Sequence, residues 1–234
     1  TFRKWYRVMI IMSATKKGIS AKEMQKQFGA KRYESTWSLM HKVRNAMGQK
    51  DNTFLLKDQV ELDEGYFKVE TTIAQKKSQK RGRGSISLVP VSIVVESSRL
   101  ENLDTKSKSM HCGRIKMKCL QDHKKESINE VLQKSVEKTS IAFTDFSTSY
   151  SDLNDIVEQQ YPMKSGNEIT KTELKWIHTA ISNSKRVFNG IYHKINKKYI
   201  QNYLDEFSYK FNRRYANNNL FYLLVKTVAF AKID

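Results

Sequence analysis

The stretch V-E-L-D-E-G-Y, residues 60–66, sets the pattern from which the rest of the sequence can be interpreted. Apolar Val60 and Leu62 alternate in it with acidic Glu61 and Asp63. Such alternation is typical of a β-strand that has one buried face and one solvated face. We therefore expect a strand here that carries both acids on its solvated face.

Further periodic segments follow this strand and predict an α/β domain. The expected strands are residues 87–96, 113–120, 140–145 and 158–163, and a helix is expected at residues 124–138. Three antiparallel strands, a helix and then a parallel strand is the order of a ribonuclease H-like mixed sheet flanked by helices. The first and fourth strands of such a sheet are neighbours, so we expect Asp63 and Asp145 to lie close together.

Two carboxylates brought together in this way predict a metal site. Like charges at short range repel and raise one pKa unless a cation lies between them. Mg²⁺ prefers oxygen ligands and takes few protein carboxylates, which leaves coordination positions for phosphate and water. Two such ions can activate an attacking oxygen and stabilise a leaving oxygen. Asp63 and Asp145 therefore indicate Mg²⁺-dependent phosphodiester chemistry, with Mn²⁺ as a substitute ion.

The first 50 residues predict a helical unit. Gly18 interrupts a first helical stripe, and Ser20 followed by Glu23 forms a capping box that opens a short second helix. A short helix, a glycine turn and a longer helix are typical of a helix-turn-helix. A plain three-helix bundle with a solvated basic face is the alternative. The candidate DNA-binding residues of the turn and the longer helix are Lys31, Arg32, Lys42 and Arg44.

The predicted division is therefore a helix-turn-helix-like domain at residues 1–50 and a ribonuclease H-like catalytic domain with C-terminal helices at residues 58–234. A basic loop at residues 76–84 suits an arm that follows phosphates, although a loop without a DNA partner is equally compatible with it. Its candidate DNA-binding residues are Lys80, Arg81 and Arg83.

The charge balance favours a polyanionic partner. The chain has 42 Lys and Arg against 24 Asp and Glu, a net charge of +18. Double-stranded DNA is the partner that fits this excess, and a membrane is not expected because no 18-residue apolar run occurs. The two cysteines form no C-x-x-C pair. We expect a cytoplasmic, nucleoid-associated protein.

Several blocks of the sequence resemble one family. They are V-E-L-D-E-G-Y-F, K-R-G-R-G before P-V-S-I-V-V-E, T-D-F-S-T-S-Y, H-T-A-I-S-N-S-K-R and Y-L-D-E-F-S-Y-K-F-N-R-R. Together they resemble the bacterial insertion-sequence transposases with an ISXO-like DDE domain. The resemblance runs from about Phe2 to Arg214 and implies a ribonuclease H-like fold, Mg²⁺-dependent DNA cleavage and insertion, and two catalytic aspartates at Asp63 and Asp145.

The resemblance also implies a third metal ligand on the late helix. Members with a glutamate carry it seven residues before a lysine, and His178 precedes Lys185 at that spacing. Asn183 is the alternative, because other members have an asparagine at the third position. Lys185 is expected to contact a DNA phosphate near the cut. The further DNA-binding candidates in the resembling blocks are Arg186, Arg213 and Arg214.

The expected function is that of an insertion-sequence transposase, which binds the terminal inverted repeats of its element and target DNA as a homodimer on DNA. The alternative is a catalytically inactive or domesticated DNA-binding descendant, because His178 and Asn183 are weaker metal ligands than a carboxylate. Members of the family often carry a zinc ribbon before the helix-turn-helix, and these 234 residues contain no C-x-x-C pair for one.

Overall fold

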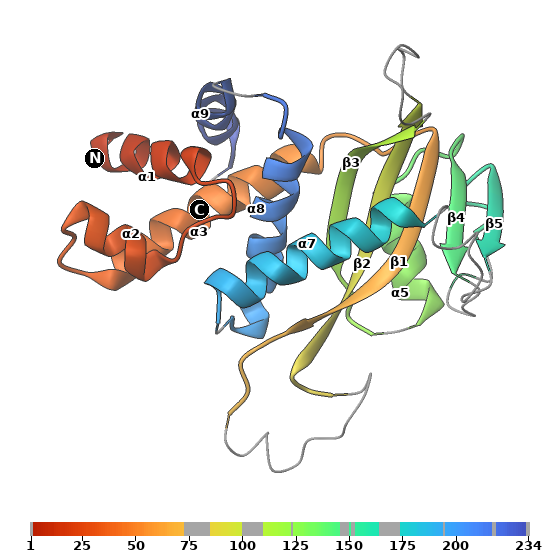
Figure 1. Cartoon of the computed structure of the whole chain (residues 1–234), viewed down its shortest axis with the longest axis horizontal. Coiled ribbons are helices and arrows are strands. Elements are labelled where there is room, and N and C mark those ends of the chain that lie inside the picture. The colour runs from red at the N-terminus through yellow and green to blue at the C-terminus, as the bar shows by residue number, and fades with distance from the viewer. Residues whose placement is uncertain are drawn as a thin grey trace.

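The computed structural model describes residues 2–72, 85–99, 110–122, 124–145, 150, 153–163, 174–193, 195–216 and 219–232. They form a sheet with helices on both faces and a group of helices beside it (Figure 1). The candidate basic loop with Lys80, Arg81 and Arg83 lies outside the described residues. Within the described part, no helix has the length and apolarity needed to cross a membrane.

The sheet has the strand order β3-β2-β1-β4-β5. Its strands are β1 (Gln59–Lys68), β2 (Leu88–Arg99), β3 (Met110–Cys119), β4 (Ile141–Asp145) and β5 (Gln159–Met163). β2 is antiparallel to β1 and to β3, whereas β4 is parallel to β1 and β5 is parallel to β4. This is the topology of a ribonuclease H-like fold, and the predicted neighbourhood of the first and fourth strands is confirmed.

Both faces of the central strand β1 are covered. Helix α5 (Lys125–Gln133) packs Ile128 and Leu132 into one hydrophobic core together with Val60 and Leu62. Helix α7 (Lys175–Ile191) lies across the other face (Figure 1) and contributes to a second core that includes Phe67 and Ile93. The expectation of a solvated face on β1 is wrong, because α7 occupies the side on which the acids lie.

Local sequence signals set the bounds of the first helices. Helix α1 (Phe2–Ala14) precedes α2 (Ala21–Phe28), at whose start the Glu23 N–H donates to the Ser20 hydroxyl at 3.1 Å. Gly29 ends α2 with a φ of 59°, in the left-handed region that glycine adopts without a steric penalty. Helix α3 (Tyr33–Asp51) follows. The predicted capping position and the predicted stop are confirmed.

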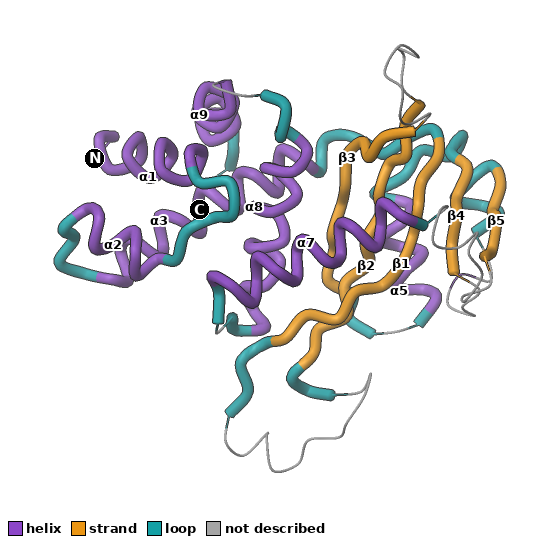
Figure 2. The backbone as a smooth tube through the Cα atoms, in the orientation of Figure 1, coloured by secondary structure: helices purple, strands orange, loops and turns teal. Residues whose placement is uncertain are grey.

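The N-terminal helices share a core with the end of the chain. Helices α8 (Ile200–Asn212) and α9 (Leu220–Phe230) follow the short 3₁₀ helix η2 (Lys197–Tyr199). α8 and α9 both contact α3, so the helical group combines both ends of the chain (Figure 2). The core of this group contains Met40 and Met47 from α3, Tyr209 from α8 and Leu224 from α9.

Helix α8 covers the edge of the sheet at β3 with two side-chain amides. Gln201 donates to the Met117 carbonyl at 3.0 Å and accepts from the Cys119 N–H at 2.8 Å. Asn212 accepts from the Ile115 N–H at 2.7 Å and donates to the Ile115 carbonyl at 3.0 Å. The backbone groups of an edge strand, which a further strand could pair with, are thus bound by side chains.

Candidate active site

The sheet brings Asp63 and Asp145 together at the point where β4 ends. The parallel register pairs Leu62 with Thr144, so the next residue on each strand is an aspartate. Side chains alternate between the faces of a strand. Asp145 therefore lies on the face of Phe143, which packs against the α7 core, and Asp63 lies on the face of Glu61. Both carboxylates face the side that α7 covers.

The environment of this pair disfavours two negative charges. Burial raises the pKa of the Asp63 carboxyl, and the charge of Asp145 raises it further. The Glu64 N–H, which donates to Asp63 Oδ1 at 2.7 Å, and the charges of His178 and Lys185 act in the opposite direction. Among the described residues, the buried Asp145 Oδ1 has no hydrogen-bond partner. A cation would satisfy both the orphaned oxygen and the surplus charge.

Helix α7 places His178 and Lys185 near this pair. His178 Nδ1 lies 3.9 Å from Asp63 Oδ2, and the His178 side chain is 54% exposed. Lys185 follows after almost two helical turns and is therefore on the same side of α7. Asn183 is rotated by about 140° around the helix from His178. Of the two third-ligand candidates, the structure places His178, and not Asn183, beside Asp63.

The fit to a metal ion is partial. Among the described residues, no group of three or more His, Cys, Asp and Glu side chains is arranged so that it could hold a metal ion. Mg²⁺ nevertheless binds through one or two carboxylates and keeps several waters. The adjacent carboxylates of Asp63 and Asp145, one with an orphaned oxygen, fit that requirement. His178 would have to approach further to become a ligand.

Glu61 is a site residue that the sequence interpretation missed. It is 2% exposed, and its Oε2 accepts a 2.8 Å hydrogen bond from the Ile177 N–H in the first turn of α7. Its neighbours in register are Val95 on β2 and Phe143 on β4. The predicted strand order could have identified Glu61, because it already put β1 in the centre of the sheet, where both faces are covered.

Tyr150 is a second missed residue, from the T-D-F-S-T-S-Y block. Its ring belongs to the core under α5, and its buried hydroxyl has no hydrogen-bond partner among the described residues. Burial raises the pKa of Tyr150 well above its usual value, and the charges of Glu64, Asp63 and Asp145 add to this effect. A protonated phenol therefore lies close to the acidic pair.

Three arginines expected to bind DNA have partners within the protein. Arg44 is fully buried, and its Nε lies 2.8 Å from Glu206 Oε2. Arg213 forms a 2.7 Å ion pair with Asp51, and Arg214 donates to the Gly113 carbonyl at 3.1 Å. The DNA-binding assignment of Arg44 is wrong, because its guanidinium is out of reach of solvent. Arg213 and Arg214 remain partly exposed, so their DNA-binding assignment stays a prediction.

The remaining basic candidates lie at or near the surface. Lys31 and Arg32, in the turn before α3, are exposed, as is Arg186 on α7. Lys42 and Lys185 are half-buried. These five residues, together with the partly exposed Arg213 and Arg214, are the described candidates for contacts with phosphates.

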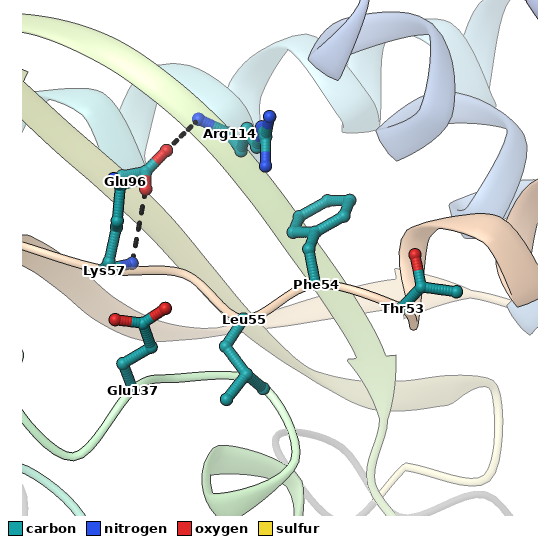
Figure 3. A pocket seen from close by; sticks show the side chains of 7 residues that line it. All are labelled: Thr53, Phe54, Leu55, Lys57, Glu96, Arg114 and Glu137. Carbon is teal, nitrogen blue, oxygen red and sulfur yellow. Dashed lines mark hydrogen bonds between the residues drawn. The ribbon is translucent and has the colours of Figure 1, made fainter.

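A separate pocket, which neither aspartate lines, lies at the start of β1 (Figure 3). It is lined by Thr53, Phe54, Leu55, Lys57, Glu96, Arg114 and Glu137. The Glu96 carboxylate accepts the N–H groups of Lys57 at 3.2 Å and Arg114 at 3.1 Å, which is visible as dashed lines in Figure 3. Glu96 is thus a structural carboxylate that joins the start of β1 to β3.

The family of the chain follows from a comparison with protein-family models. The model of the ISXO2-like transposase domain matches residues 55–212, from just before β1 to the end of α8. A comparison with curated protein sequences gives no significant match. The match covers the sheet, both aspartates, α7 and the block in α8 that carried the resemblance. The chain therefore belongs to the family of ISXO2-like transposases.

Proposed function

We propose that this protein is the DNA transposase of an insertion sequence, and that it cleaves the ends of its element and joins them to target DNA. The observation that carries the proposal is the adjacency of Asp63 and Asp145 within a matched transposase domain. A buried, orphaned oxygen on Asp145 and a raised pKa of Asp63 support a role for the pair in binding a divalent cation.

In this proposal Asp63 and Asp145 hold Mg²⁺, with Mn²⁺ as a substitute, and His178 is the third ligand. When bound, the ion would activate the attacking oxygen and stabilise the leaving oxygen of a phosphodiester. The protein's own role would be to hold the carboxylates of Asp63 and Asp145 on adjacent strands. It would also keep Lys185 on the same side of α7 as His178, where the ammonium group can bind a phosphate next to the cut.

The proposed partner is double-stranded DNA, namely the terminal inverted repeats and the target. The exposed Lys31, Arg32 and Arg186, with the half-buried Lys42 and Lys185, would supply phosphate contacts. Because transposition joins two element ends, we propose a homodimer on DNA, in the cytoplasm and associated with the nucleoid. The net charge of +18 supports long-range attraction to DNA.

The decisive experiment is a cleavage and strand-transfer assay on DNA that carries the terminal repeats of the element, with Mg²⁺ and with Mn²⁺. Asp63→Asn and Asp145→Asn should each lower the rate by about a thousandfold or more, because the ion supplies several kcal/mol of transition-state stabilisation. Asp155→Asn, at an exposed aspartate in the turn before β5, is the matched control and should retain activity.

Binding of the repeats without cleavage by either ion would overturn the proposal and favour the alternative, a transposase-derived protein that only binds DNA. The third ligand needs a separate comparison. His178→Ala should weaken Mn²⁺ binding, measured by the paramagnetic resonance signal of free Mn²⁺, whereas Asn183→Ala should leave it unchanged. The opposite result would make Asn183 the ligand.

A further inference from the structure

The buried carboxylate of Glu61 is attached to the helix that carries His178. Ile177 is the third residue of α7, and its N–H is one of the groups at a helix start that lack a partner within the helix. The first hydrogen bond within the helix is the one from the His178 N–H to the Leu174 carbonyl, at 3.3 Å. The Ile177 N–H instead donates to Glu61 Oε2 at 2.8 Å.

This contact stabilises both partners. A buried carboxylate is strongly destabilising unless hydrogen bonds satisfy it, and the start of a helix offers N–H groups together with a partial positive charge. Conversely, the first turn of α7 would fray more easily without the acceptor. The bond crosses from the central strand of the sheet to α7, so it fixes the height of the helix start above β1.

The same two segments carry the proposed third ligand and the first aspartate. His178 directly follows Ile177, and Asp63 lies two residues after Glu61 on the same face of β1. The contact between Glu61 and Ile177 and the 3.9 Å approach of His178 to Asp63 therefore join β1 and α7 at adjacent points.

We propose that Glu61 is a positioning residue, which holds the start of α7 so that the His178 imidazole stays beside Asp63. Glu61 touches neither the proposed ion nor DNA, and it acts only through His178. The part of the proposal that concerns metal affinity rests on the proposed function, whereas the part that concerns the position of His178 does not.

The position of His178 can be read from nuclear magnetic resonance of the imidazoles in metal-free protein. The chain has five histidines, and loss of one signal in His178→Ala identifies that of His178. Glu61→Leu removes the acceptor, and Glu61→Asp keeps the charge but is one methylene too short to reach Ile177. Both should move the His178 signals in the same sense as Asp63→Asn, and amide exchange at Ile177 should become faster.

Two controls separate this effect from general destabilisation. Glu61→Gln keeps an acceptor oxygen at the same distance from the backbone and should retain the wild-type His178 signals. Glu96→Leu removes another buried glutamate that accepts two backbone N–H groups (Figure 3). Glu96 pairs with Val60 at the start of β1, so its side chain lies on the face of the sheet opposite to Glu61 and α7, and its loss should leave His178 unaffected. If Glu61→Leu does not fold, the proposal is tested by comparing Glu61→Asp, which should shift the His178 signals, with Glu61→Gln, which should not.

Mn²⁺ affinity provides the second measurement. Loss of an outer-shell partner typically weakens metal binding by about 10- to 100-fold, and we expect this loss for Glu61→Leu but not for Glu96→Leu. The loss should disappear when Glu61→Leu is made in a His178→Ala background. An equal loss in both backgrounds would overturn the proposal, because Glu61 would then not act through His178.

The proposal is also overturned if the Glu61 variants leave the His178 signals unchanged while Asp63→Asn moves them. It is also overturned if Asp63→Asn leaves the His178 signals unchanged, since His178 would then not lie beside Asp63. A wild-type protein that binds no Mn²⁺ would instead refute the proposed metal chemistry, and the His178 signals would still decide the role of Glu61.

Discussion

Two groups of buried charges in this molecule are built in opposite ways. Between α3 and α8, the carboxylate of Glu206 is bound by Arg44 at 2.8 Å, by Lys210 at 2.6 Å and by the hydroxyl of Tyr192 at 3.3 Å. We call Arg44, Glu206 and Lys210 the paired cluster. Between β1 and β4, by contrast, the acidic pair of Asp63 and Asp145 places two like charges on neighbouring strands.

The pKa values show the difference. Burial alone would raise the pKa of Glu206, but the charges of Lys210 and Arg44 lower it to about 2. Burial also raises the pKa of Asp63, and there its aspartate neighbour adds to the effect. The opposite charges of the paired cluster thus compensate one another. The acidic pair weakens the fold at neutral pH, as functional sites often do, because its charges lack full compensation.

The largest effect should come from breaking the paired cluster. Glu206→Leu leaves Arg44 buried without its carboxylate and should lower the free energy of unfolding by about 3–5 kcal/mol, measured by urea denaturation. The triple variant Arg44→Met, Glu206→Leu, Lys210→Met should recover most of that loss, because it removes every member. A triple variant as unstable as the single one would show that the loss comes from packing and not from an unpaired charge.

The second prediction tests whether a bound cation compensates the charges of the acidic pair, as Arg44 and Lys210 compensate the charge of Glu206. A ligand that binds only the folded state at a hundred times its dissociation constant stabilises it by about 2.7 kcal/mol. Mn²⁺ at that excess should therefore raise the unfolding free energy of the wild type by this amount and leave Asp145→Asn nearly unaffected. Equal stabilisation of both proteins would indicate that the ion binds elsewhere.

The third prediction separates basic residues that are proposed to contact DNA from those that bind other parts of the protein. Lys185→Ala should weaken DNA binding and reduce the slope of log affinity against log salt by about 1, because one phosphate contact is lost. Arg213→Ala removes an ion pair with Asp51 and should destabilise the fold instead, with the salt slope unchanged. A lower salt slope for Arg213→Ala in folded protein would show that Arg213 contacts DNA.

The smallest effect concerns pH. The pKa of Asp63 is raised in the folded protein, so its contribution to stability is present below the ordinary aspartate pKa of about 3.9 and is lost as the pH rises through the raised value. Metal-free Asp63→Asn should therefore be slightly more stable than the wild type at pH 7, and the difference should vanish near pH 3. Thermal unfolding across this range, without divalent ions, measures it; a less stable Asp63→Asn at pH 7 would contradict the assigned direction.

Most of the fold could be predicted from the sequence because its signals are local. The alternation around Val60 and Leu62, the cap at Ser20 and the stop at Gly29 each act over a few residues. The adjacency of Asp63 and Asp145 followed from the strand order alone. These features required no knowledge of which side chains meet across the molecule.

The errors concern contacts over long distances in the chain. Arg44 looked like a DNA-binding residue because its partner Glu206 lies far away in the sequence, on a helix that has no local link to α3. Asn212 and Arg213 likewise bind Asp51, a partner that lies far from them in the sequence. Residue type reveals the charge of a side chain but not the partner that neutralises it.

The amides of Gln201 and Asn212 that cover β3 have a consequence for self-association. Side chains that occupy both the N–H and the carbonyl positions of an edge act as a substitute for a sixth strand, so another copy of the protein cannot extend the sheet there. A dimer assembled on DNA would have to meet through other surfaces. Conversely, loss of either amide would open a template for strand addition, and aggregation would then compete with assembly on the element ends.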